Sequence, residues 1–111
     1  MSSTFQEKLN KKWQEKKFLC INLDPVFEKL PAHLQTLPIE EALTSFNKEV
    51  IDKTKDLVAA YKPNSAYYEA YGEAGYRALK KTAEYMQSTC PDVVTILDAK
   101  RGDIGHTNEM Y

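Results

Sequence analysis

The sequence holds little of what marks the common cofactor-binding and membrane classes. Its four glycines form neither a GxGxxG fingerprint nor a P-loop, so the usual glycine-rich seats for nucleotide cofactors are missing. The two cysteines, Cys20 and Cys90, make no CxxC pair or disulfide framework, which is typical of thiols in a reducing compartment. The first apolar run, FLCINL, is far shorter than the roughly 18 residues of a membrane span.

The charge balance of the chain excludes some classes of partner. Fifteen basic and 16 acidic residues give a formal net charge of -1, which provides no general attraction to nucleic acid or anionic membranes. No signal peptide is visible at the start of the chain. His33 and His106 lack metal-ligand spacing. We therefore expect a cytoplasmic protein with no metal, no cofactor, and no nucleic-acid or membrane partner. Its 111 residues are a plausible size for one small domain, residues 1–111.

Helical and extended patterns alternate along the chain. Apolar runs at 19–23, 57–64 and 93–97 predict buried strands, because each is short, continuous and ended by a breaker or a charge. Helical periodicity predicts helices over 3–16, from Pro38 to about 51, and over 73–87, with one short helical turn at 67–71. Residues 26–38 are expected to form a long loop with one short turn of helix. This order predicts an α/β fold with a parallel sheet covered by helices.

The helical patterns also predict how each helix begins and which side it buries. Ser3 and Gln6 match a capping box at the first helix. The predicted apolar faces are Phe5, Leu9 and Trp13 in the first helix, Leu43, Phe46, Val50 and Ile51 in the second, and Tyr76, Leu79, Ala83 and Met86 in the third.

An ionisable residue stands at the end of each predicted strand. Asp24, Lys62 and Asp98 follow one another at intervals of 38 and 36 positions, as stacked β/α units would produce. Because ligands of α/β folds bind at the carboxyl ends of the strands, these three charges are expected to converge on one edge.

Further charges follow the third strand in the stretch VVTILDAKRGDIGHT. Asp98 and Lys100 are two apart, so an extended chain points both to one side. Asp103 and Thr107 are four apart, so a following helix would present them together. A buried array of lysines and aspartates is costly to desolvate, which favours function, although a surface salt-bridge network stays open as an alternative. Aspartates could hold Mg²⁺, but the interleaved lysines already neutralise them.

Three segments carry a resemblance to a known family. FLCINLDP, AAYKPNSAYYEAYG and LDAKRGDIGHT, in this order, resemble orotidine 5'-phosphate decarboxylase, and most closely its second bacterial subfamily. The resemblance implies a TIM (β/α)8 barrel, of which this chain covers roughly the first three β/α units. It also implies decarboxylation of orotidine 5'-phosphate to uridine 5'-phosphate and CO₂ in pyrimidine biosynthesis, without metal or organic cofactor.

The resemblance assigns roles to the charges. Lys100 corresponds to the proton donor to C6 of the pyrimidine, and Asp98 to the carboxylate set against the carboxylate of the substrate. Lys62 corresponds to the lysine that orients Asp98 and touches the ribose. Elementary chemistry agrees, since a fixed ammonium stabilises the negative charge that decarboxylation leaves on carbon and can then supply the proton.

Other residues match positions that bind the ribose. Asp24 matches the ribose-binding aspartate of the first strand, while Asp103 and Thr107 match a pair contributed across a homodimer interface. Asp103 also belongs to the catalytic set that the resemblance implies, with Lys62, Asp98 and Lys100. A complete barrel takes about 250 residues, and the family's phosphate-binding late loops have no counterpart in these 111 residues. We therefore expect the 111 residues alone to be inactive.

Two alternatives stay open at this point. One is a Mg²⁺-dependent sugar-phosphate decarboxylase or aldolase of the same barrel group, which shares the Asp-x-Lys pattern. The other is a non-catalytic half-barrel that assembles with a complementary half.

Overall fold

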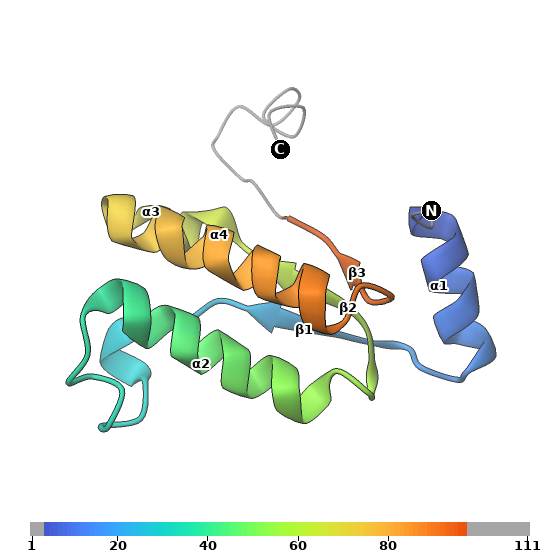
Figure 1. Cartoon of the computed structure of the whole chain (residues 1–111), viewed down its shortest axis with the longest axis horizontal. Coiled ribbons are helices and arrows are strands. Elements are labelled where there is room, and N and C mark those ends of the chain that lie inside the picture. The colour runs from blue at the N-terminus through green and yellow to red at the C-terminus, as the bar shows by residue number, and fades with distance from the viewer. Residues whose placement is uncertain (1–3, 98–111) are drawn as a thin grey trace.

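The computed structural model describes residues 4–97, and these form a three-stranded parallel sheet in the order β1-β2-β3 with helices packed on it (Figure 1). The elements are α1 (Phe5–Gln14), β1 (Leu19–Leu23), the 3-10 turn η1 (Phe27–Lys29), α2 (Ile39–Thr54), β2 (Val58–Pro63), α3 (Ser65–Glu69), α4 (Gly72–Thr89) and β3 (Val94–Thr95). The predicted alternation of helices and strands and the parallel sheet are confirmed.

The strand register sets which residues are neighbours across the sheet. Asn22 pairs with Lys62 and Leu23 with Pro63, after an irregularity between Leu19 and Cys20. β3 is shorter than the predicted strand over 93–97, but the N–H of Ile96 still donates to the carbonyl of Tyr61 at 2.8 Å. The pairing of β2 with its neighbour therefore continues past the bounds of β3.

Helices α2 and α4 lie side by side over one face of the sheet (Figure 1). Two apolar clusters fill the space between these layers. One joins the strands to the ends of α2 and α4, and it comprises Leu23, Ile51, Val58, Tyr61, Met86, Cys90 and Val93. The other lies toward η1 and α3, and it comprises Leu30, Leu34, Ala42, Leu43, Tyr68 and Ala78.

The first strand is less buried than its apolar sequence predicts. Leu19 is 58% exposed and Cys20 is exposed, while only Leu23 is fully buried. The reason is position, because β1 forms an edge of the described sheet and α2 and α4 cover only one face of it. Cys20 is therefore exposed although it lies in a run predicted to be a buried strand, whereas Cys90 is buried.

The first helix also departs from its predicted face. Phe5 and Trp13 are about half exposed, and the buried side chain of α1 is that of Lys12. Its Nζ lies 2.6 Å from Oδ2 of Asp92, in the turn before β3, and this hydrogen bond holds the pKa of Asp92 below its ordinary value. The charged pair fixes α1 at the end of the sheet where the strands begin (Figure 1).

The N-terminal cap of α1 sits one residue later than predicted. The side chain of Thr4 accepts from the N–H of Glu7 at 3.1 Å, and the Glu7 carboxylate accepts from the N–H of Thr4 at 3.0 Å. The pair is therefore Thr4 with Glu7 rather than Ser3 with Gln6. It satisfies two backbone donors that a helix start leaves unpaired.

The buried face of α4 shares Met86 with the predicted face, and its other three positions each lie one residue earlier than predicted. Gly75, Ala78, Thr82 and Met86 are buried, whereas Tyr76 is 66% exposed. Small side chains are needed there because α3 packs very close. A Cβ on Gly75 would lie 1.7 Å from the carbonyl oxygen of Tyr68. The predicted apolar face of α2 is confirmed, with Leu43 and Ile51 fully buried.

None of the helices between residues 4 and 97 is both long enough and apolar enough to cross a membrane.

Candidate active site at the carboxyl edge of the sheet

Two of the predicted site residues lie at one edge of the sheet. Asp24 directly follows β1, and Lys62 is the next-to-last residue of β2. The two strands are parallel neighbours, so their carboxyl ends meet at the same edge. This is the edge where α/β enzymes place their chemistry.

Lys62 belongs to the face of the sheet that points away from α2 and α4. Its chain neighbour Tyr61 is buried in the helix-side core, and Leu23 on β1 is buried in the same cluster. Because side chains alternate along a strand, Lys62 and its register partner Asn22 face the other way. In a closed barrel that face is the interior.

Asp24 is fixed by a backbone donor from the neighbouring unit. Its Oδ1 accepts from the N–H of Asn64 at 3.0 Å. Asn64 in turn caps α3, since its own side-chain oxygen accepts from the N–H of Ala66 at 3.0 Å. The carboxylate is therefore tied to the start of the helix that follows β2.

Two tyrosine hydroxyls hold the backbone on either side of Asp24. Tyr68 donates to the carbonyl of Leu23 at 2.6 Å, and Tyr71 accepts from the N–H of Phe27 at 2.9 Å. Burial raises the pKa of Tyr68 well above its ordinary value, so its hydroxyl keeps the proton that it donates. The short segment 24–26 is thus anchored at both ends to α3 and to the turn after it.

Further buried polar groups support Tyr68. The side-chain amide of Asn47 on α2 donates to the Tyr68 hydroxyl and to Oγ1 of Thr82 on α4, both at 3.0 Å. All three side chains are fully buried. The sequence reasoning missed these residues. A signal existed, because Asn47 is four positions from both Leu43 and Ile51 and so lies on the apolar face of its helix.

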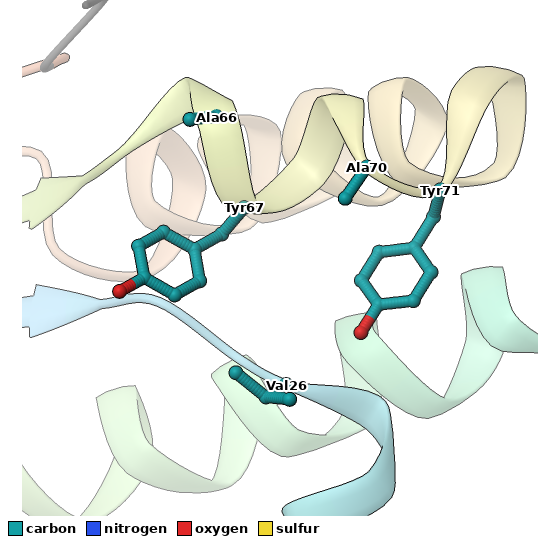
Figure 2. Close-up of a pocket in the computed structure, with 5 residues that line it drawn as sticks. All are labelled: Val26, Ala66, Tyr67, Ala70 and Tyr71. Carbon is teal, nitrogen blue, oxygen red and sulfur yellow. The ribbon is translucent and has the colours of Figure 1, made fainter.

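A pocket of about 290 Å³ opens beside the anchored segment, between it and α3. In Figure 2, the rings of Tyr67 and Tyr71 extend from the α3 region toward Val26. Apolar atoms form most of its wall, and its five lining residues are Val26, Ala66, Tyr67, Ala70 and Tyr71.

The other predicted site residues, Asp98, Lys100, Asp103 and Thr107, lie outside the described residues. Between residues 4 and 97 no group of three or more histidine, cysteine, aspartate or glutamate side chains is placed to hold a metal ion.

Comparison with known proteins identifies the family. The sequence model of the "Orotidine 5'-phosphate decarboxylase / HUMPS family" matches residues 17–111, which is most of the chain. The chain belongs to this family. Among curated members, it is 53% identical over 98 residues to the orotidine 5'-phosphate decarboxylase of Flavobacterium johnsoniae, covering 88% of this chain and 35% of that protein. It is 48% identical over 108 residues to the enzyme of Christiangramia forsetii, covering 97% and 39%.

A solved structure of the same family has the same fold. The putative orotidine-monophosphate-decarboxylase from Toxoplasma gondii superposes with a TM-score of 0.76 at 34% identity, over 95% of this chain and 34% of that one. The predicted fold class is confirmed, and the described residues are β/α units of a TIM barrel. The chain spans between a third and two-fifths of the length of these curated relatives.

Proposed function

We propose that this chain supplies the first β/α units of an orotidine 5'-phosphate decarboxylase, which converts orotidine 5'-phosphate to uridine 5'-phosphate and CO₂. The observation that carries the proposal is the family match over residues 17–111. The position of Asp24 and Lys62 at the carboxyl edge of two neighbouring parallel strands supports it.

Lys62, Asp98 and Lys100 are the proposed reacting set. β3 is the neighbour of β2, and in the sequence Asp98 follows the last residue of β3 by three positions. We propose that Lys100 stabilises the negative charge that develops at C6 of the pyrimidine and then protonates that carbon. Asp98 keeps Lys100 charged and faces the carboxylate of the substrate, and Lys62 orients Asp98.

Asp24 is the proposed ribose ligand, since a carboxylate with one oxygen bound to a backbone N–H still has lone pairs for a sugar hydroxyl. Asp103 and Thr107 are proposed to reach the ribose of a partner subunit in a homodimer. The domain proposed is one barrel that includes residues 1–111, acting in the cytoplasm without metal or cofactor, with the phosphate of the substrate held by later β/α units.

A chimeric enzyme tests this function. The chain replaces the aligned segment of the Flavobacterium johnsoniae relative, and loss of orotate absorbance measures turnover. The folded chimera is expected to turn over orotidine 5'-phosphate. Lys62→Ala is expected to lower kcat/KM by roughly 100-fold, because loss of the side chain that orients Asp98 misplaces a reacting group.

The matched control is Lys53→Ala, because Lys53 is an exposed lysine of α2. This variant is expected to keep kcat/KM within about two-fold, a change of under 0.5 kcal/mol. Circular dichroism establishes that each protein is folded. A folded chimera without turnover, or a Lys62→Ala variant as active as the parent, would contradict the proposal.

A further inference from the structure

The buried polar network under Asp24 joins four elements of the fold at one point. Tyr68 on α3 donates to the Leu23 carbonyl at the end of β1, and Asn47 on α2 donates to Tyr68 and to Thr82 on α4. The last bond in the chain runs from the Thr82 hydroxyl to the carbonyl of Ala78 at 2.7 Å. Each hydroxyl thus donates to a backbone carbonyl and accepts from the same amide group.

The hydrogen-bond donors in this network can be assigned. Tyr68 and Thr82 each use their single proton on a carbonyl, so each hydroxyl can only accept in its bond with Asn47. The amide NH₂ of Asn47 has two protons, and it supplies one to each hydroxyl. Its oxygen has no partner among the described residues. The Asn47 amide bonds both hydroxyls while its own buried oxygen stays unsatisfied, so the network contributes little to the stability of the fold. This points to a role in holding the two hydroxyls in a defined geometry.

The network ends at the residue before Asp24, the proposed ribose-binding residue. The carbonyl that Tyr68 binds belongs to Leu23, and the next residue is Asp24, whose carboxylate is bound to the N–H of Asn64. Tyr68 and Asn64 belong to the same short segment around α3. A shift of Tyr68 would therefore disturb Asp24 from both its backbone and its side chain.

Tyr68 is closely packed on both its side chain and its backbone. Its side chain is fully buried, and its carbonyl oxygen lies where a Cβ on Gly75 of α4 would stand. The segment after Asp24 has a second anchor in the bond from the Phe27 N–H to the Tyr71 hydroxyl. Tyr68 and Tyr71 thus bind the backbone on the two sides of Asp24.

We infer that Tyr68, held by Asn47 and Thr82, is a positioning residue that sets the Asp24 carboxylate for the ribose of the substrate. This inference rests on the proposed function, which names Asp24 as the ribose ligand. Tyr68 acts through Asp24 and does not itself touch the substrate.

A double-mutant cycle in the chimeric enzyme tests the coupling. Tyr68→Phe is expected to lower kcat/KM by roughly 10-fold, because small misplacements of a binding group are costly to turnover. In an Asp24→Ala background, the same change is expected to have no further effect, since the group that Tyr68 positions is gone. If the two losses instead multiply, Tyr68 acts independently of Asp24 and the inference is wrong.

Tyr61→Phe is the matched control for general damage. Tyr61 is as buried as Tyr68, and its hydroxyl also bonds to a carbonyl, that of Ile51. That bond lies toward the other end of α2, away from Asp24. Tyr61→Phe is expected to lower stability by a similar amount while leaving kcat/KM within about two-fold. An equal loss of activity in both variants would refute a specific positioning role.

A second readout needs no activity. The Asn64 amide proton bonds to Asp24, so its NMR shift and its hydrogen exchange report where the carboxylate is. Tyr68→Phe is expected to raise the exchange rate of this amide by roughly 10-fold, and Tyr61→Phe to leave it unchanged. If the parent chimera proves inactive, the proposed function fails while this readout still decides whether Tyr68 holds Asp24. An unchanged Asn64 amide in Tyr68→Phe would overturn the inference.

Thr82→Val provides the same test if Tyr68→Phe does not fold. It removes the more distant hydroxyl at nearly constant volume, and the loss of one acceptor frees the Asn47 amide to turn. The expected changes in kcat/KM and in Asn64 exchange have the same sign as for Tyr68→Phe and are smaller. No change in either quantity would count against the network.

Discussion

The half-buried ion pair between Lys12 of α1 and Asp92 allows a prediction of stability from its geometry. The Lys12 side chain is 2% exposed, whereas its partner Asp92 is 51% exposed, at a separation of 2.6 Å between Nζ and Oδ2. Removing one partner of a fully buried pair costs about 3 to 5 kcal/mol, because the other charge is left uncompensated in the interior. The two substitutions that break this pair should therefore have unequal costs.

Asp92→Asn leaves the buried ammonium without its main partner. Solvent around Asp92 weakens the pair, and Glu15 lies 4.0 Å from the same ammonium, so the expected loss of unfolding free energy falls to about 2 kcal/mol. Lys12→Met removes the buried charge and keeps an apolar stem, and the carboxylate left behind is already half solvated. Its expected cost is about 1 kcal/mol or less.

The pair also predicts how stability depends on pH. The Lys12 hydrogen bond lowers the pKa of Asp92 from its ordinary value of 3.8. A depressed pKa contributes stability that is complete above the ordinary value and is lost as the pH falls through the folded-state pKa. The stability gap between the parent and Asp92→Asn should thus be constant near neutral pH and narrow below pH 3.8.

Urea unfolding of the chimeric enzyme at several pH values measures both effects. Lys11→Met is the control, because Lys11 is an exposed lysine on the same helix, and it should change the unfolding free energy by less than about 0.5 kcal/mol. An equal cost for Lys12→Met and Asp92→Asn, or a stability gap for Asp92→Asn that widens toward acid pH, would refute the role assigned to this ion pair.

Two other predictions concern glycines and thiols. Gly75→Ala should destabilise the chimeric enzyme by roughly 3 kcal/mol or more, because the new Cβ would lie 1.7 Å from the Tyr68 carbonyl oxygen. At Gly72 a new Cβ would meet open space, and the only strain comes from the left-handed backbone (φ +62°). Gly72→Ala should therefore cost about 1 to 2 kcal/mol of unfolding free energy. Thermal unfolding compares the two variants, and a larger loss of stability in Gly72→Ala would contradict the close packing at Gly75. In the 111-residue chain a thiol reagent should modify exposed Cys20 and spare Cys90, whose burial also raises its thiol pKa. In the chimera, closure of the barrel should protect Cys20 from the thiol reagent. Equal labelling of Cys20 in the chimera and in the 111-residue chain would contradict the assignment of this face of β1 to the barrel interior.

The sequence was sufficient for the order of the elements. Strand runs such as 57–64 are continuous and end at Pro63, and the helix stripe of Leu43 and Ile51 repeats at helical spacing. These signals are local, so they survive without knowledge of the tertiary fold. The position of Asp24 and Lys62 at one edge also followed from the strand order, because parallel neighbours end on the same side.

Features that depend on contacts between distant elements could not be predicted from the local sequence. The burial of Lys12 depends on Asp92, 80 positions away, and the inner face of α4 depends on the close approach of Tyr68 to Gly75. Apolar Leu19 predicted a buried strand, yet β1 is an edge of the described sheet and Leu19 is largely exposed. The hydropathy of a side chain indicates the environment that it favours, whereas its burial depends on which elements pack against it.

The proposed reaction is tested most directly by following the carboxylate carbon. The chimeric enzyme is incubated with orotidine 5'-phosphate labelled in the carboxylate, with EDTA present, and released CO₂ and uridine 5'-phosphate are both counted. Equal amounts of the two products are expected, undiminished by EDTA, and both products should be lost in Lys100→Ala. A folded chimera that releases no CO₂, or one that needs added Mg²⁺, would contradict the proposed reaction.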